Sequence, residues 1–193
     1  MNYLAHLALA FPHNGLIIGN FIGDHIRNKE LVRYKKTIQR GVLMHREIDL
    51  FTDRHKQTIA LRKLLFPEYR HFSRVLVDIY YDHFLALHFH KFHQQGLAAF
   101  VVEVEAVLTK HKDELPNSAQ SYLNGMITQG WLLMYAEING VDDILQMMSR
   151  RTKYSILSSG INGLTDHYKQ IEARFLRFYP ELIAYCSRIK KNS

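Results

Sequence analysis

Residues 97–108 read LAAFVVEVEAVL, and their apolar side chains recur at steps of three and four residues. This spacing places them in one stripe of an amphipathic helix, because 3.6 residues complete a helical turn. The same period appears in residues 119–136 and 166–178, and residues 36–51 and 72–92 also read as helices. No alternation typical of strands is sustained along the chain. The sequence therefore predicts an all-α fold of about eight to ten helices.

Helix ends are expected where the local chemistry stops the helical hydrogen bonds. Asn117 or Ser118 is suited to cap the helix over 119–136. The pair Asn139-Gly140 is expected to end that helix, because glycine tolerates the left-handed conformation found at helix ends. Breaks are also expected at the four prolines, which lack a backbone N–H: Pro12, Pro67, Pro116 and Pro180.

The chain has 193 residues, of which 47 % are hydrophobic, so we expect one compact helical domain over 1–193. Cys186 is the only cysteine, which excludes an intrachain disulfide and a cysteine-rich zinc site. The amino-terminal segment does not resemble a signal peptide, and no apolar run is long enough to span a membrane. We therefore expect a cytoplasmic protein without a membrane contact. The sequence does not indicate its oligomeric state.

The net charge of +7 favours acidic partners, whether nucleic acid, anionic lipid, phosphorylated metabolites or an acidic protein. The chain contains no Gly-x-Ser-x-Gly elbow, no P-loop and no Gly-x-Gly-x-x-Gly motif. Serine hydrolysis through that elbow and nucleotide binding through those loops are therefore unsupported.

Histidines and aspartates at helical spacing are the remaining candidates for chemistry. Asp78 and Asp82 lie four residues apart, so they share one helix face and repel each other. Either a divalent cation or an Arg or Lys side chain between them would relieve this repulsion. His45, Asp49 and Asp53 form a second row with the same spacing. Imidazole and carboxylate together suit manganese, iron or zinc.

Two further residues could join these rows. Asp24 follows the segment Gly19-Asn20-Phe21-Ile22-Gly23, whose small residues would let helices approach closely. That approach could bring Asp24 near the other two acidic helices. His6 interrupts a short apolar run and could point inward.

Five segments in order resemble the acyl carrier protein phosphodiesterase family. They are the start at Met1–Leu7, the segments 19–24, 44–53 and 78–85, and the ending Phe178-Tyr179-Pro180. The resemblance implies a helical fold related to the HD-domain metal phosphohydrolases. It also implies hydrolysis of holo-acyl carrier protein to the apo form and 4′-phosphopantetheine, with a divalent metal, Mn²⁺ or Mg²⁺.

The chain departs from the HD signature, because it contains no adjacent His-Asp pair and has the reverse order at Asp82-His83. The expected ligands are therefore chosen by helix face and by the family's segments. They are Asp24, His45, Asp49, Asp78 and Asp82, with Asp49 as a ligand or as a partner of a ligated histidine. His83 or His6 is expected to transfer a proton, and Arg46 either holds a phosphate oxygen or pairs with Glu47 or Asp49.

Basic residues between two ligand segments would steer the acidic carrier protein. They are Arg27, Lys29, Arg33, Lys35, Lys36 and Arg40. Arg150, Arg151 and Lys153 form a second basic cluster. Two other functions stay open. One is a helical metal phosphohydrolase for a nucleotide or small phosphate ester, and the other is a non-enzymatic nucleic-acid-binding module, although no recognised nucleic-acid motif accompanies the charge.

Overall fold

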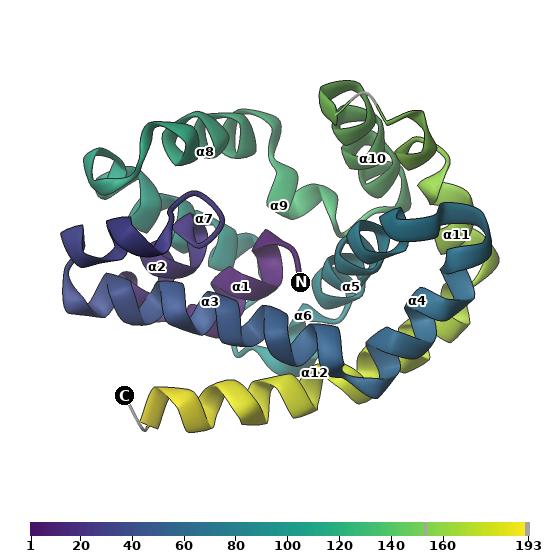
Figure 1. The fold of residues 1–193 in the computed structure, drawn as a ribbon, viewed down its shortest axis with the longest axis horizontal. Helices are drawn as coiled ribbons and strands as arrows, with labels where there is room; N and C mark the ends of the chain where they lie inside the picture. Colours follow the sequence, from purple (N-terminus) through teal and green to yellow (C-terminus); the bar gives the residue numbers. More distant parts are fainter. Residues whose placement is uncertain (153, 192–193) are drawn as a thin grey trace.

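The computed structural model describes residues 1–152 and 154–191, and all regular structure in these residues is helical (Figure 1). The predicted all-α fold is therefore confirmed. The α-helices of the described residues are α1 Tyr3–Ala10, α2 Asn14–Ile22, α3 Lys36–Arg54, α4 Lys56–Tyr69, α5 Ser73–Leu87, α6 Phe89–Phe92, α7 Leu97–Lys110, α8 Asn117–Gln129, α9 Trp131–Met134, α10 Ile138–Thr152, α11 Gly160–Asp166 and α12 Tyr168–Lys191. Short 3-10 helices are η1 Asn28–Arg33, η2 Arg70–Phe72, η3 Lys112–Glu114 and η4 Ser155–Leu157.

Two predicted helices match single elements, because α3 contains residues 36–51 and α7 contains residues 97–108. The predicted helix over 119–136 is wrong as one element. Gly130 adopts φ 65°, ends α8 and begins the single turn of α9. Asn139-Gly140 lies in the first turn of α10 rather than at a helix end. A Cβ on Gly140 would lie 2.1 Å from the carbonyl oxygen of Met134, so close packing requires this glycine.

The prolines break helices at two of the four expected positions. Pro12 follows the end of α1, and Pro116 precedes the first residue of α8. The breaks expected at Pro67 and Pro180 are wrong, because these residues lie inside α4 and α12. Each costs its helix one backbone hydrogen bond. In α12 the burial of neighbouring aromatic side chains such as Phe178 and Tyr179 offsets that loss.

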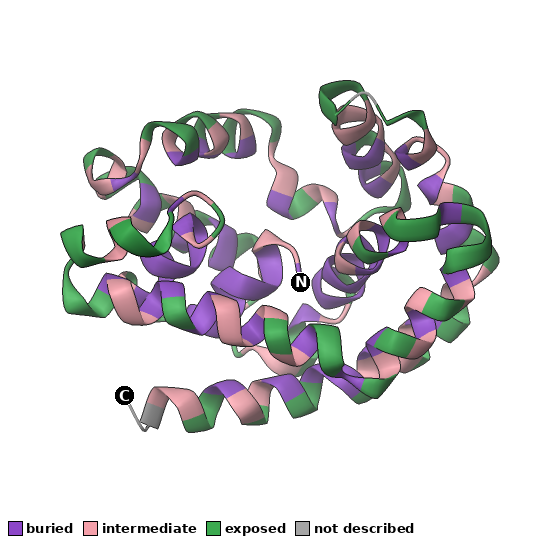
Figure 2. Cartoon of the chain, viewed as in Figure 1, coloured by how far each residue is buried: buried purple, intermediate pink, exposed green. Residues whose placement is uncertain are grey.

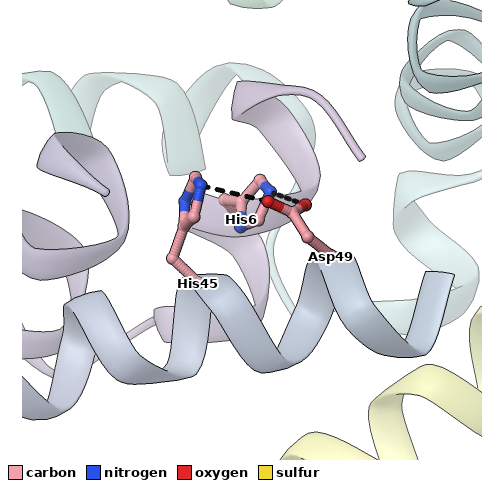
Figure 3. A group of neighbouring side chains, drawn as sticks. All are labelled: His6, His45 and Asp49. Carbon is pink, nitrogen blue, oxygen red and sulfur yellow. Dashed lines mark hydrogen bonds and ion pairs between the residues drawn. The ribbon is translucent and has the colours of Figure 1, made fainter. Parts of the chain in front are cut away.

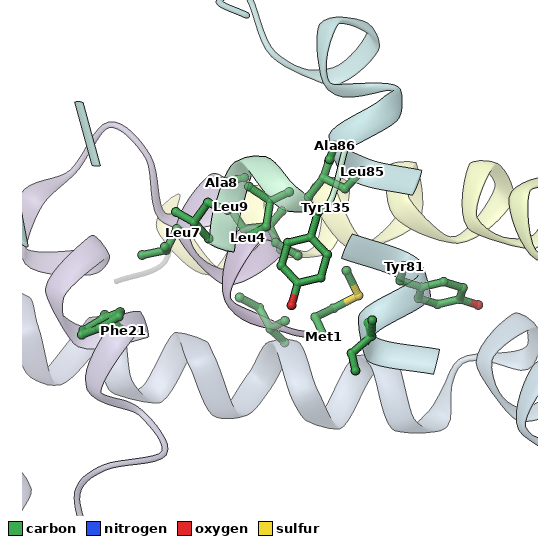
Figure 4. Packing of buried hydrophobic residues seen from close by; sticks show 14 of the residues in the cluster. Met1, Leu4, Leu7, Ala8, Leu9, Phe21, Tyr81, Leu85, Ala86 and Tyr135 are labelled. Carbon is green, nitrogen blue, oxygen red and sulfur yellow. The ribbon is translucent and has the colours of Figure 1, made fainter. Parts of the chain in front are cut away.

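Helix α1 lies at the centre of the molecule, and all its residues from Leu4 to Ala10 are buried (Figure 2). It packs against α2, α3 and α5. The Asn2 side chain accepts a hydrogen bond from the Tyr3 N–H and so caps its start. Figure 4 shows Met1 and Leu4 packed beside Tyr135 and α5 in the hydrophobic cluster. His6, which lies on this helix, is therefore buried with its neighbours.

Glycines set the close crossing of α2 and α3. A Cβ on Gly19 would lie 2.2 Å from the carbonyl oxygen of Ile38 and 2.5 Å from the Cα of Gly41. No larger residue fits at this contact without moving the backbone. The crossing brings the carboxyl end of α2 against the middle of α3, as the small residues around Asp24 predict.

In residues 1–152 and 154–191, no helix combines the length and the apolar character that crossing a membrane requires.

Candidate metal centre

The imidazoles of His6 and His45 stack against each other and converge on the carboxylate of Asp49 (Figure 3). The ring centroids are 4.0 Å apart, and the planes meet at 17°. His6 Nε2 lies 3.1 Å from Asp49 Oδ1, and His45 Nε2 lies 3.3 Å from Asp49 Oδ2. His6 comes from α1, whereas His45 and Asp49 are one turn apart on α3. Both imidazoles are buried, and the carboxylate is partly exposed.

Asn20, which is fully buried on α2, orients both rings from the opposite side. Its side-chain oxygen lies 3.3 Å from His6 Nδ1, and its backbone carbonyl accepts a hydrogen bond of 2.9 Å from His45 Nδ1. The Asn20 amide nitrogen donates to the Leu16 carbonyl, so its oxygen faces His6. Both Nδ1 atoms are therefore committed to Asn20, and both Nε2 atoms face the carboxylate.

Asp24 extends this group toward solvent. It lies just past the end of α2, and its Oδ1 is 3.2 Å from His45 Nε2, while its side chain is 68 % exposed. A Cβ on Gly23 would lie 2.3 Å from Cγ of His45, so the backbone beside Asp24 rests directly on the imidazole. The predicted approach of Asp24 to the His45 helix is confirmed.

The charges of the group are strongly coupled. Burial lowers the pKa of His6, and neighbouring His45 lowers it further. Burial also opposes the charged form of His45, but hydrogen bonds to Asp24 and Asp49 outweigh it and raise its pKa to about 9. Burial would raise the pKa of Asp49, yet hydrogen bonds from both histidines hold it far below its usual range. The hydrogen bond from His45 also lowers the pKa of Asp24.

These donors fit a divalent cation. The ligand atoms of His6, His45 and Asp49 all lie within 4.8 Å of one another. Neutral His6 carries one proton, yet both its ring nitrogens face acceptor oxygens, those of Asn20 and Asp49. One nitrogen therefore faces an acceptor without a hydrogen. A cation between His6 Nε2 and Asp49 would resolve this conflict, and the Asn20 contact is the kind that orients a ligated imidazole.

The amino terminus supplies the positive charge beside Asp78. The Met1 ammonium lies 3.0 Å from Asp78 Oδ1 and 3.7 Å from Asp49 Oδ1. Burial would lower the pKa of this ammonium, but the charges of Asp78 and Asp49 more than offset the effect and raise it. Because the Met1 ammonium lies near both Asp49 and Asp78, Asp78 borders the histidine group. The role of Asp78 as a metal ligand stays a prediction.

Asp82 lies one turn further along α5, at the start of α1. Its Oδ2 accepts a hydrogen bond of 2.8 Å from the Leu4 N–H, so the carboxyl group caps the first turn of α1. Its Oδ1 has no hydrogen-bond partner in residues 1–152 and 154–191, and burial raises the pKa of this group to about 8. The geometry does not bring Asp82 into the His6–His45–Asp49 group, and its ligand role also stays a prediction.

A cleft of about 630 Å³ opens beside Asp24. Its walls come from the amino terminus, from α8 and α9, and from α10. The residues that line it are mainly aromatic and aliphatic, with Arg150 and Arg151 among them. The histidine group therefore borders a cleft of the size and polarity of a small-molecule site.

Comparisons with known proteins agree with the resemblance seen in the sequence. A sequence model of the family described as acyl carrier protein phosphodiesterase matches residues 1–182. The chain belongs to the acyl carrier protein phosphodiesterase family. Proteins of that name from Photorhabdus laumondii and Serratia proteamaculans are each 32 % identical to it. These matches cover 95 % of this chain and 93 % and 96 % of the relatives.

A further relative in the acyl carrier protein phosphodiesterase family comes from Salmonella dublin and is 30 % identical over 97 % of this chain and 98 % of its own length. No solved structure is significantly similar to this chain. The HD-like arrangement implied by the resemblance therefore stays a prediction.

The two other expected catalytic residues of this family member lie outside the histidine group. His83 is buried on α5, where its Nδ1 donates to the Tyr135 carbonyl and its Nε2 lies 2.8 Å from the Tyr168 hydroxyl. Burial lowers its pKa. Arg46 is half-buried next to His45 and has no ion-pair partner in the part of the chain that the structure describes. Their catalytic roles stay predictions.

The expected partner-binding residues form an exposed basic segment. All are exposed except Arg40, which is half-buried. Lys35 pairs with Glu114 at 3.3 Å, and the others have no ion-pair partner in residues 1–152 and 154–191. In the second basic cluster, Arg150 and Arg151 are exposed at the cleft, whereas Lys153 lies outside the described residues.

Sequence reasoning assigned no role to Asn20 or to the aromatic wall of the cleft. Asn20 stands inside a quoted family segment, but its contacts with both histidines depend on the α2–α3 crossing. Tyr3 lies far in the sequence from Tyr122 and Trp131, and the three residues share no spacing signal. Asp53, the last residue of the row that begins at His45, pairs with Arg62 at 2.5 Å and is not part of the His6–His45–Asp49 group.

Proposed function

We propose that this protein is a metal-dependent phosphodiesterase that releases 4′-phosphopantetheine from the serine of holo-acyl carrier protein in the cytoplasm. One observation carries the proposal. In a chain of this family, the His6–His45–Asp49 group reaches through Asp24 to a cleft large enough for a small ligand. A phosphodiester that links a protein to a flexible arm matches this combination of a polar centre and an adjoining cleft.

The proposed ligands are His6, His45 and Asp49, with Asp24 and Asp78 as the nearest additional carboxylates. Two imidazoles favour Mn²⁺ over Mg²⁺, because Mg²⁺ prefers oxygen ligands. When bound, the cation would supply positive charge for the phosphate oxygens and would lower the pKa of bound water to near neutral. In this role His6 is a ligand rather than a proton donor.

The protein's own groups orient the centre and the substrate. Asn20 holds both imidazoles by their Nδ1 atoms, which leaves the Nε2 atoms directed at Asp49. The departing serine oxygen needs a proton, and His83 is the remaining histidine among the expected donors. Arg46 is the proposed contact for a phosphate oxygen, because its guanidinium has no carboxylate to satisfy it in the described residues.

The surface charge supports an acidic protein substrate. The exposed segment of Arg27, Lys29, Arg33, Lys35 and Lys36 follows Asp24 directly in the chain. A basic surface beside the centre would accelerate encounter with an acidic carrier and make the reaction sensitive to salt. A small phosphate ester would show a weaker dependence on this surface.

The test is incubation of the purified protein with holo-acyl carrier protein and Mn²⁺, followed by mass spectrometry of the carrier. We expect the carrier to lose the mass of 4′-phosphopantetheine with Mn²⁺ and to keep it with EDTA. His45→Ala and Asp49→Asn should abolish the release. The matched controls are His90→Ala and Asp166→Asn, since both residues are exposed and lie outside the group.

An unchanged carrier mass, with Mn²⁺ or Mg²⁺ supplied and the helical fold verified by circular dichroism, would contradict the carrier-protein assignment. Hydrolysis of a nucleotide or of bis(4-nitrophenyl) phosphate under those conditions would favour the small phosphate ester instead. Nucleic-acid binding that ignores the loss of Asp49 and Asp78 would favour the non-enzymatic alternative.

A further inference from the structure

The cleft adjoins the proposed centre through one residue. Asp24 lines the cleft and also lies 3.2 Å from His45 Nε2. A phosphate held at the histidine group therefore has one substituent at the mouth of this cleft. If the protein acts on holo-acyl carrier protein, that phosphate has two substituents, the carrier's serine and the pantetheine arm. The carrier is a folded protein and is too large for 630 Å³, so only the arm can enter.

One wall of the cleft is a set of locked aromatic rings. Tyr3 and Tyr122 stack with centroids 4.5 Å apart, and Trp131 meets Tyr122 edge-on at 4.9 Å. The Tyr3 hydroxyl is hydrogen-bonded to His25, which restrains the ring further. Such preformed apolar faces suit a chain of methylene and methyl groups, because contact costs little reorganisation.

A second part of the lining belongs to α10 and is adaptable. Ile144, Met147 and Met148 face the cleft, and the two methionines are only partly buried. Methionine side chains are flexible and fit irregular apolar surfaces. A linear flexible ligand would thus be held between a rigid wall and a compliant one.

Two uncharged polar groups on the lining can donate hydrogen bonds to amide carbonyls. The Trp131 Nε1–H donates to Gln129 Oε1, and the Gln129 amide nitrogen, which has no hydrogen-bond partner in the part of the chain that the structure describes, can donate to a ligand carbonyl. The Tyr135 hydroxyl accepts from Asn2 Nδ2, and within the described residues its own hydrogen has no acceptor, so it can donate to a ligand. Arg150 and Arg151 are exposed at the cleft, and Arg151 lies 5.7 Å above the Tyr122 ring. Their charges favour an anionic substrate at the rim.

We propose that this cleft is the binding site for the pantetheine arm, with the phosphate at Asp24 and the two amides between the aromatic wall and α10. The inference rests on the proposed function and adds a substrate subsite to it. The gem-dimethyl group and methylenes contact the rings, while Gln129 and Tyr135 donate to amide carbonyls. The site thus recognises the prosthetic group itself, separately from the protein that carries it.

Binding can be followed directly, because Trp131 is the only tryptophan in the chain. The full-length protein is titrated with pantetheine, 4′-phosphopantetheine, inorganic phosphate and adenosine monophosphate, and the tryptophan fluorescence is recorded. We expect saturable changes with the two pantetheine compounds and none with phosphate. A response to adenosine monophosphate without one to pantetheine would overturn the inference and assign the cleft to a nucleotide.

Kinetics give an independent test. Tyr122→Leu removes a ring of the wall, and Gln129→Ala alters an exposed residue with little risk to folding. We expect each variant to lower kcat/KM for holo-acyl carrier protein about tenfold more than kcat/KM for bis(4-nitrophenyl) phosphate, which has no arm. Tyr154→Leu is the matched control, since this tyrosine is 55 % exposed and does not line the cleft.

The two proposals fail differently. If the unaltered protein releases the arm but both variants reduce the two activities equally, the subsite is wrong and the proposed function stands. If the unaltered protein releases nothing from the carrier while Trp131 responds to pantetheine, the proposed function is wrong and the binding site stands.

Discussion

The Gly23 Cα and the His45 imidazole are in such close contact that a methyl group on this glycine would lie 2.3 Å from Cγ of the ring. The backbone of Gly23 is right-handed helical, so alanine is not strained there by its own conformation. We therefore expect Gly23→Ala to push the imidazole away from Asp24 and Asp49. The affinity for Mn²⁺, measured by isothermal titration calorimetry, should fall at least about tenfold. Gly96→Ala is the control, because no atom lies within 4 Å of its added methyl group.

Metal binding should stabilise the folded protein. Because the ligands come from α1 and α3, only the folded chain presents His6, His45 and Asp49 together. At a Mn²⁺ concentration about 100 times Kd we expect a gain of about 2.7 kcal/mol in unfolding free energy, which EDTA should reverse. Urea unfolding followed by circular dichroism measures the effect. The same gain in Asp49→Asn as in the parent would contradict the ligand set, whereas Asp166→Asn should behave like the parent.

The buried carboxyl group of Asp82 should make stability depend on pH. Burial raises its folded-state pKa to about 8 from 3.8, so between these values the folded chain holds a proton that the unfolded chain has released. The contribution of this group to unfolding free energy is therefore present at low pH and declines as pH rises toward 8, by up to about 1.4 kcal/mol per pH unit.

Asp82→Asn should remove this decline, because the amide keeps an oxygen for the Leu4 N–H and does not ionise. The difference in unfolding free energy between the variant and the parent should therefore move in favour of the variant from pH 5 to pH 8. Urea titrations at each pH measure it, with Asp166→Asn as the exposed control. A parallel pH profile in the two proteins would show that Asp82 stays ionised in the fold.

The exposed basic segment should act on encounter with the carrier rather than on chemistry. Lys29→Glu combined with Arg33→Glu should raise KM for holo-acyl carrier protein about tenfold at low salt, because the attraction is long-range. The effect should shrink as NaCl is raised. The control is Lys63→Glu, an exposed charge reversal on α4. An equal change in the double variant and the control would show only an effect of net charge.

The spacing of residues along the sequence predicted helices, and it predicted which residues lie together on one helix face. The period of three to four residues correctly marked α7, residues 36–51 were correctly expected to be helical, and the four-residue spacing of His45 and Asp49 placed them on one face. Such spacing determines neighbours because both residues belong to the same turn geometry. The close approach of Asp24 to α3 was expected because glycine, which has no side chain, lets two backbones cross closely.

The same rules failed where packing outweighs local preference. Pro67 and Pro180 were expected to end helices, but both lie inside helices. Beside Pro180, the burial of Phe178 and Tyr179 offsets the one lost hydrogen bond. Gly130, rather than Asn139-Gly140, ends α8. Gly130 adopts the left-handed conformation that ends a helix, whereas Gly140 lies inside α10 and packs against the Met134 carbonyl.

By itself, the sequence determined an all-α chain and its family, and it marked Asp24, His45 and Asp49 as candidates that the structure brings together. The tertiary structure alone decided that the His6 ring stacks on His45, that Asn20 contacts both imidazoles, that the amino terminus lies beside Asp78, and that Asp82 caps α1. It also assembled the cleft from Tyr3, Tyr122 and Trp131. These contacts join residues far apart in the chain. Their geometry depends on how α1, α5 and α8 to α10 pack, which no local spacing encodes.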